Sequence, residues 1–207
     1  MNGVFIALAI IIAYLIGSVP SAYIIGRLRK GTDIREEGSR NMGAMNVFYS
    51  VGFWWGFLVL AMDVGKGAAA MGVAYALGVH EVVRFLAGAA AVLGHGFPLF
   101  LGFRGGKGGA TCLGVLYVLM PWGIPFTLAI FGVILLITRY PTLGYSVALL
   151  CFPFLGWLIY DRWELIVFSV GLLLIPLIRY IPRLKEMKSK AGNWRHVFRR
   201  KGLADRL

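Results

Sequence analysis

Eight residues near the middle of the chain combine an adaptable backbone with positive charge. The stretch Gly102-Phe103-Arg104-Gly105-Gly106-Lys107-Gly108-Gly109 holds five glycines and two cations, and apolar runs lie on both sides. Glycine lets a ligand approach backbone N–H groups closely, and successive N–H groups can form an anion-binding nest. A helix beginning after the glycines would direct its positive end at the same place. The pattern favours a phosphate-binding loop, and the alternative is a short basic connection between two membrane helices.

This loop differs from two common nucleotide motifs. A Walker A loop needs glycine five residues before the Gly-Lys pair and Ser or Thr after it, and those positions hold Leu101 and Gly108. No strand is expected before the loop, so a dinucleotide-binding fingerprint is not supported either.

A second polar motif lies earlier, in Glu37-Gly38-Ser39-Arg40-Asn41-Met42-Gly43-Ala44-Met45-Asn46. Ser and Asn side chains supply neutral donors for phosphate or hydroxyl oxygens. Asn and Gly also favour turns and helix caps, so a purely structural turn is the alternative.

Three further polar residues fall in or beside apolar segments. Asp63 and Lys66 are three residues apart, and therefore on one face of the expected helix. Each charge at bilayer depth costs about 2.5–3.5 kcal/mol on insertion scales, so the pair either neutralises itself or supports a site. His95 precedes the glycine loop by seven residues, where it could serve as a general base, a phosphate donor or a structural residue.

The metal-ligating residue types form no site pattern. The three histidines, His80, His95 and His196, are far apart in sequence. Cys112 and Cys151 both lie in apolar segments, where a thiol usually acts as a small hydrophobic group. We expect neither a metal nor another cofactor.

The segments that carry these motifs are those of a membrane protein. Hydrophobic residues make up 59% of the 207 residues, and the mean hydropathy is +0.77. Long apolar runs recur, and the first lacks the basic leader of a cleaved signal. We expect an all-α integral membrane protein with about seven helices, one of them short or broken, at about 3–27, 51–79, 82–101, 109–120, 122–138, 143–160 and 164–181.

The basic residues predict the orientation. Of the 21 Lys and Arg residues, all but Lys66, Arg84 and Arg162 fall in alternate connections or in the C-terminal tail. The positive-inside rule therefore predicts an outside N-terminus and a cytoplasmic C-terminus. The net charge of +12 then reflects topology and contact with anionic lipid more than nucleic-acid binding. We divide the chain into a membrane domain, 1–182, and a basic cytoplasmic tail, 183–207.

Taken in order, the motifs resemble one known family. Gly17 to Gly26, Gly38 to Asn46, Asp63 to Gly67, and above all Gly94-His95-Gly96-Phe97-Pro98 through Thr111, are similar to the bacterial acyl-phosphate:glycerol-3-phosphate acyltransferases (PlsY). Arg139-Tyr140-Pro141-Thr142-Leu143 resembles that family's third motif. The resemblance implies a multi-pass enzyme of the bacterial inner membrane with its active site facing the cytoplasm. It would move a fatty acyl group from acyl phosphate to glycerol 3-phosphate, giving lysophosphatidic acid, without a metal or nucleotide.

The resemblance also implies residue roles. Catalytic roles would belong to Asn46, His95 and Lys107, and supporting roles to Asp63 and Lys66. The donor phosphate would be held by Arg104, Gly105, Gly106, Lys107, Gly108 and Thr111. The acceptor would be held by Ser39, Arg40, Asn41, Asn46, Arg139 and Thr142. Acyl phosphate is already activated, so binding and neutralising two anions would be the main task. We expect a monomer.

The acceptor side departs from the family pattern. The family usually has Gly where this chain has Arg40, Thr where it has Met45, and arginine where it has Tyr49. The His and Asn that usually follow the last helix are absent from Arg179-Tyr180-Ile181-Pro182-Arg183. Arg40 could replace the lost arginine, or the acceptor could differ.

Two other classes remain open from the sequence. Broken helices and buried charges also suit a transporter of a phosphorylated or lipid substrate. A relative that has lost activity, or that serves as a lipid-binding or partner protein, is the second alternative. The absence of a visible inverted repeat and the one-sided polar motifs favour surface chemistry over the alternating access of a transporter.

Overall fold

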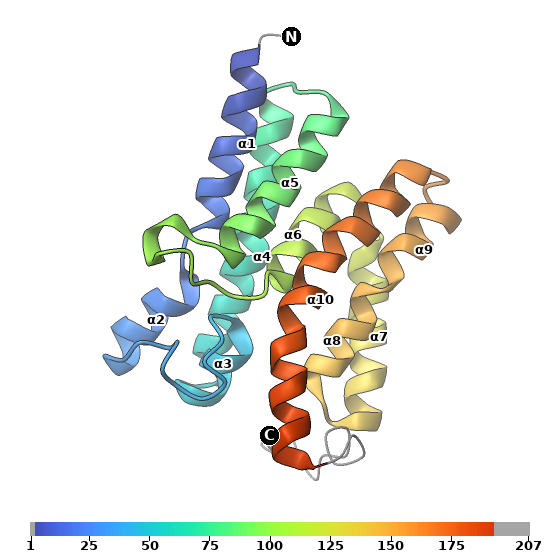
Figure 1. Ribbon diagram of the computed structural model, residues 1–207. Helices are drawn as coiled ribbons and strands as arrows, with labels where there is room; N and C mark the ends of the chain where they lie inside the picture. The colour runs from blue at the N-terminus through green and yellow to red at the C-terminus, as the bar shows by residue number, and fades with distance from the viewer. Residues whose placement is uncertain (1–2, 193–207) are drawn as a thin grey trace. The chain divides into compact units, whose positions relative to one another are not determined.

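The computed structural model describes residues 3–192, and within that range the regular structure is helical throughout. The chain forms two compact units, the first ending at Leu119 and the second beginning at Met120. The first unit contains α1 (Gly3–Gly17), α2 (Ser21–Lys30), α3 (Ala44–Ser50), α4 (Phe53–Ala76), α5 (Glu81–Gly96), the 3₁₀ turn η1 (Leu99–Leu101) and α6 (Gly109–Leu119) (Figure 1). The second contains α7 (Gly123–Thr138), α8 (Pro141–Leu149), α9 (Cys151–Leu158) and α10 (Trp163–Ala191). The expected all-α class is confirmed.

Every expected apolar segment contains a helix. Five helical stretches are long and apolar enough to cross a membrane: Gly3–Lys30, Phe53–Ala76, Glu81–Leu101, Pro141–Leu158 and Trp163–Ser189. Two apolar helices are shorter, α6 and α7. The short helix that the sequence predicts after the glycine loop is therefore α6, whose 11 residues are too few to span a bilayer.

The first expected segment is interrupted rather than continuous. The helix stops at Gly17, and α2 begins at Ser21. Pro20 explains the break, because proline has no N–H to donate and disfavours helical dihedrals at the residue before it. The Ser18 hydroxyl donates to the carbonyl of Tyr14 at 2.8 Å and satisfies part of the helix end.

The last two expected segments also differ from the sequence analysis. Pro153 cannot donate to the carbonyl of Leu149, which accounts for the interruption between α8 and α9. The final helix continues past residue 181, through Pro182, to Ala191. Packing outweighs the proline here, because Met187 of this extension is 1% exposed and lies in a buried cluster with Tyr140.

Small residues let the helices of the first unit approach closely. A core cluster of alanines and valines joins α1, α4 and α5 (Figure 1). In addition, α4 packs against α6, where a Cβ added to Gly114 would overlap the carbonyl oxygen of Val64. Close backbone approach of this kind is how membrane helices gain packing energy without a hydrophobic driving force. It also fixes α6, whose N-terminus follows the glycine loop.

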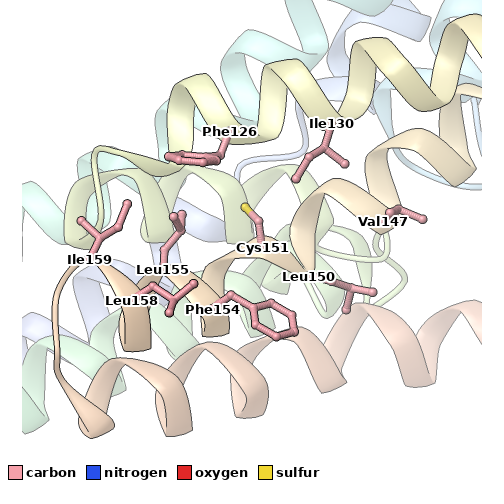
Figure 2. Close-up of a pocket in the computed structure, with 9 residues that line it drawn as sticks. All are labelled: Phe126, Ile130, Val147, Leu150, Cys151, Phe154, Leu155, Leu158 and Ile159. Carbon is pink, nitrogen blue, oxygen red and sulfur yellow. The ribbon is translucent and has the colours of Figure 1, made fainter.

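An apolar groove of about 470 Å³ lies within the second unit, between α7 and the α8–α9 pair (Figure 2). Its lining is Phe126, Ile130, Val147, Leu150, Cys151, Phe154, Leu155, Leu158 and Ile159. The single sulfur of Cys151 is the least apolar side-chain atom of that lining. The groove therefore suits hydrocarbon and offers no group for acid–base chemistry.

Candidate active site

The candidate site is built from two connections of the first unit. The first connection comprises residues 31–43, between α2 and α3, and the glycine connection comprises residues 97–108, between α5 and α6. They meet at Gly106, where an added Cβ would lie 2.5 Å from the carbonyl oxygen of Met42 and would overlap Nε2 of His95. The structure thus brings together three motifs that are separate in sequence.

Asn46 organises the first connection. It lies in α3 and is 3% exposed. Its Nδ2 donates to the carbonyl oxygens of Ile34 and Glu37, at 2.8 and 3.0 Å, and its Oδ1 accepts from the N–H of Ser39 at 2.9 Å. The Asn46 side chain therefore fixes the path of the preceding loop. These bonds favour a positioning role for Asn46 over the catalytic role that the resemblance implied.

Arg40 has a backbone conformation that arginine seldom adopts. Its φ is 56°, in the left-handed region. Glycine is the residue usually found at this position in the family that the sequence resembles, and glycine adopts such a φ without steric cost. The side chain of Arg40 is exposed, between Ser39 and Asn41. Tyr49, at the position where that family has arginine, packs its ring edge-on against Phe48 at 5.0 Å.

The glycine connection folds back on the end of α5. The N–H of Gly105 donates to the carbonyl of Gly96, and the N–H of Gly106 donates to the carbonyl of His95, both at 3.1 Å. These two N–H groups, which the sequence led us to expect in a phosphate nest, therefore have partners within the protein. The first N–H groups of an α-helix lack intrahelical acceptors, so the N-terminus of α6 at Gly109 offers N–H groups that could bind an anion.

The expected donor-side side chains surround that helix start. Arg104 is exposed, and Lys107 is half-buried. Gly108 has φ 93°, a conformation that favours glycine. Thr111 is completely buried, and its hydroxyl has no hydrogen-bond partner in the protein. A buried hydroxyl without a partner calls for an explanation, and a ligand that reaches it would supply one.

Beneath the glycine connection lies a buried ionic cluster. Asp63 Oδ1 is 2.9 Å from Lys66 Nζ and 3.6 Å from His95 Nδ1. The three residues are 1%, 7% and 4% exposed. Lys66 Nζ also donates to the carbonyl of Val19 at 3.0 Å, at the break between α1 and α2. Asp63 therefore supplies the counter-charge of Lys66 and lies beside the His95 ring.

Two expected acceptor residues, Arg139 and Thr142, belong to the second unit. Arg139 ends α7 with φ 54°, and Thr142 lies in the first turn of α8. Among the described residues, four other than glycine have φ in the left-handed region: Arg40, Phe103, Arg139 and Asp161. The first three fall one each in the three motif-bearing connections, and such strain gathers at functional sites.

Sequence reasoning missed the pair Asp33 and Arg35. Arg35 Nη2 is 2.7 Å from Asp33 Oδ2, and its Nη1 donates to the carbonyl of Leu101 at 3.4 Å. The hydrogen bond from Arg35 holds the pKa of Asp33 below its usual range. An acidic and a basic residue two positions apart were a local signal for this pair. The bond from Arg35 to Leu101, 66 residues further along the chain, was not visible in the sequence.

The chain is similar to known proteins over nearly its whole length. The family model described as glycerol-3-phosphate acyltransferase matches residues 7–190. A protein of Dehalococcoides mccartyi named glycerol-3-phosphate acyltransferase 2 is 50% identical over 206 residues, covering 99% of this chain and 98% of the relative. The glycerol-3-phosphate acyltransferase of Bacillus subtilis is 39% identical over 185 residues, covering 89% and 95%.

Two solved structures share the fold. Both are of PlsY, an integral membrane glycerol 3-phosphate acyltransferase. Its glycerol 3-phosphate form has a TM-score of 0.80 and 33% identity, and its lysophosphatidic acid form has 0.78 and 32%. Each match covers 89% of this chain and 92% of the solved chain. Together with the family model, these matches show that this chain belongs to the glycerol-3-phosphate acyltransferase family of integral membrane proteins.

Proposed function

We propose that this protein transfers a fatty acyl group from acyl phosphate to the 1-hydroxyl of glycerol 3-phosphate, giving lysophosphatidic acid for phospholipid synthesis. One observation carries the proposal: Gly106 brings the glycine connection into contact with Met42 of the first connection and with His95. A donor phosphate at the start of α6 and an acceptor held by the first connection would then be neighbours. The names of the relatives and the two ligand forms of PlsY support glycerol 3-phosphate as the acceptor and lysophosphatidic acid as the product.

The donor side binds an anion through charged side chains and through backbone N–H groups. Arg104 and Lys107 neutralise the acyl phosphate, and the N-terminus of α6 supplies N–H groups and a favourable dipole. Gly105 and Gly106 act differently, because their N–H groups brace the loop against α5. The Thr111 hydroxyl, which has no partner in the protein, donates to a phosphate oxygen.

The acceptor side holds the phosphate of glycerol 3-phosphate. Ser39, Arg40 and Asn41 form its edge in the first unit, and Asn46 keeps them in place. A role for Arg139 and Thr142, which belong to the second unit, stays a prediction from the sequence. Arg40 supplies the charge that the family's usual arginine would give at the position of Tyr49.

The chemistry needs few groups from the protein. The acceptor hydroxyl oxygen bonds to the acyl carbon, the bond from that carbon to the phosphate oxygen breaks, and inorganic phosphate leaves with the hydroxyl proton. Such a reaction gains mainly from positioning and from neutralising charge. His95 faces Asp63 on one side of its ring and Gly106 on the other, so it positions the glycine connection.

Purified protein in detergent micelles tests this function directly. The experiment supplies labelled palmitoyl phosphate with glycerol 3-phosphate, dihydroxyacetone phosphate or glycerol, and measures the labelled product. Lysophosphatidic acid is the expected product. Transfer to another acceptor would mean that the acceptor side has changed, and no transfer to any alcohol would favour the transporter or inactive-relative alternatives.

The placement in the cell is part of the proposal. We place the protein in the bacterial inner membrane as a monomer, with the site facing the cytoplasm, residues 1–182 in the membrane domain and 183–207 in a basic tail. The distribution of Lys and Arg supports this orientation. Cysteines at the exposed positions His80 and Lys188 test it, because a membrane-impermeant maleimide should label the first only from outside and the second only from the cytoplasmic side.

A further inference from the structure

We propose that Arg35 is a positioning residue that holds the glycine connection against the first connection, and so sets the distance between the two bound substrates. The inference rests on the proposed function for its kinetic consequence, and on contacts in the structure for its geometry. Arg35 is outside the phosphate-binding sets, because its guanidinium is already engaged with protein groups.

One side of the guanidinium is fixed by Asp33. Arg35 Nε donates to Oδ1 at 3.0 Å, and Nη2 donates to Oδ2 at 2.7 Å. The backbone N–H of Arg35 also donates to Asp33 Oδ1 at 3.0 Å. Asp33 is 9% exposed, and a two-pronged pair of this kind holds the guanidinium plane in one orientation.

The other side of the guanidinium reaches the glycine connection. Arg35 Nη1 donates to the carbonyl oxygen of Leu101, 66 residues away, at 3.4 Å. Leu101 is followed by Gly102 and Phe103, both with left-handed φ, so its carbonyl stands where the chain turns. The Leu101 side chain also packs against the core cluster that contains Ile34. The contact therefore fixes the turn that leads into the phosphate loop.

The residue between the pair ties it to the acceptor motif. Ile34 is fully buried, and its carbonyl accepts the 2.8 Å hydrogen bond from Asn46. Residues 33–35 are therefore bonded to the acceptor motif through Asn46 and to the glycine connection through Leu101. A side chain that bonds to both connections can set their spacing without touching either substrate.

Loss of this tie should affect alignment more than binding. Each phosphate site keeps its own groups, but the two reacting atoms no longer meet at one fixed distance, and misplacement by about 1 Å can cost on the order of 100-fold in rate. We therefore expect Arg35→Ala to lower kcat by about 10- to 100-fold, with both KM values within about twofold of wild type. Direct binding of one substrate would instead raise the KM of that substrate alone.

Two variants sharpen the measurement. Arg35→Lys keeps the charge and the ion pair with Asp33, but a single ammonium lacks the fork that reaches Leu101 as well, so kcat should stay low. Arg27→Ala is the matched control, because Arg27 also faces Asp33, at 4.0 Å, and is 48% exposed. Its kcat should equal that of wild type. Wild-type kcat in Arg35→Lys would overturn the proposal.

A distance measurement tests the geometry without using activity. Spin labels at the exposed positions Glu36 and Phe100 report the separation of the two connections by pulsed electron resonance, with Cys112 and Cys151 buried in the unlabelled protein. We expect a narrow distance distribution with native Arg35 and a broad one with Arg35→Ala. Equal widths would refute the positioning role even if transfer is observed. Failure of the unlabelled wild-type protein to form lysophosphatidic acid would instead count against the proposed function.

Discussion

The imidazole of His95 lies directly against Gly106, so that a methyl group added to this glycine would overlap Nε2 of the ring. The same methyl group would press on the carbonyl of Met42. Gly106 is therefore required for the close approach between the glycine connection and its support.

Replacing Gly106 should abolish transfer without preventing insertion. Gly106→Ala forces His95 and the glycine connection apart. We expect activity below about 1% of wild type, because a misplacement of the reacting groups by about 1 Å can cost on the order of 100-fold in rate. The measurement is acyl transfer per mole of purified protein. Gly72→Ala is the control, because an added Cβ there meets nothing within 4 Å. Near-normal turnover of Gly106→Ala would remove the proposed phosphate loop.

Arg40 allows its charge and its conformation to be separated. Arg40→Ala and Arg40→Gly both delete the guanidinium, so each should raise the KM for glycerol 3-phosphate about tenfold or more, as for loss of a charged hydrogen bond of about 1.5–3 kcal/mol. The KM for acyl phosphate should not change. Only Arg40→Gly relieves the left-handed φ of 56°, so it should be about 1 kcal/mol more stable than Arg40→Ala. An unchanged KM in both variants would show that Arg40 does not bind the acceptor.

The buried cluster at Asp63 should respond strongly to loss of its carboxylate. Asp63→Asn leaves the Lys66 ammonium buried without a counter-charge, which typically destabilises by about 3–5 kcal/mol. Thermal unfolding in detergent measures the loss, and Asp161→Asn, the same change at an exposed position, is the control. Adding Lys66→Met should recover stability but leave activity low, because His95 still lacks its partner. Recovery of activity in the double variant would contradict the supporting role.

Acid should weaken the Asp33–Arg35 pair. Because Arg35 lowers the pKa of Asp33 below the ordinary value of 3.8, the folded protein favours the carboxylate form. The resulting stabilisation is fully present above the ordinary value and is lost as pH falls through the folded pKa. The unfolding temperatures of wild type and Asp33→Asn should therefore differ at pH 7 and converge below pH 3.8. For Glu36→Gln, a change at an exposed neighbour, the difference in unfolding temperature from wild type should not shrink as the pH is lowered.

The sequence predicted the membrane helices because their apolar runs are long and charges interrupt them rarely. It misplaced the end of the last helix, since the burial of Met187 beside Tyr140 is a tertiary effect that outweighs Pro182. The glycine loop was recognisable from composition alone. The partners of its N–H groups were not, because they are carbonyls at the end of α5.

Asn46 shows the same limit in the other connection. Its type and position favoured a residue that touches substrate, whereas its amide is bonded to the backbone of Ile34, Glu37 and Ser39. The sequence pointed to residues that the structure places in or beside the two connections, but it could not distinguish a side chain that faces a ligand from one that shapes a loop. Only the hydrogen-bond partners make that distinction.

The bond from Lys66 to the carbonyl of Val19 joins parts of the chain that leave the ribosome at different times. When the first segment enters the bilayer, the acceptor at its break lacks this donor until Lys66 of α4, 47 residues later in the chain, has been synthesised. The arrival of α4 therefore completes the first segment, and it brings with it the carboxylate that neutralises Lys66. The polar contacts of the broken first segment are therefore complete only after a later helix has been inserted beside it.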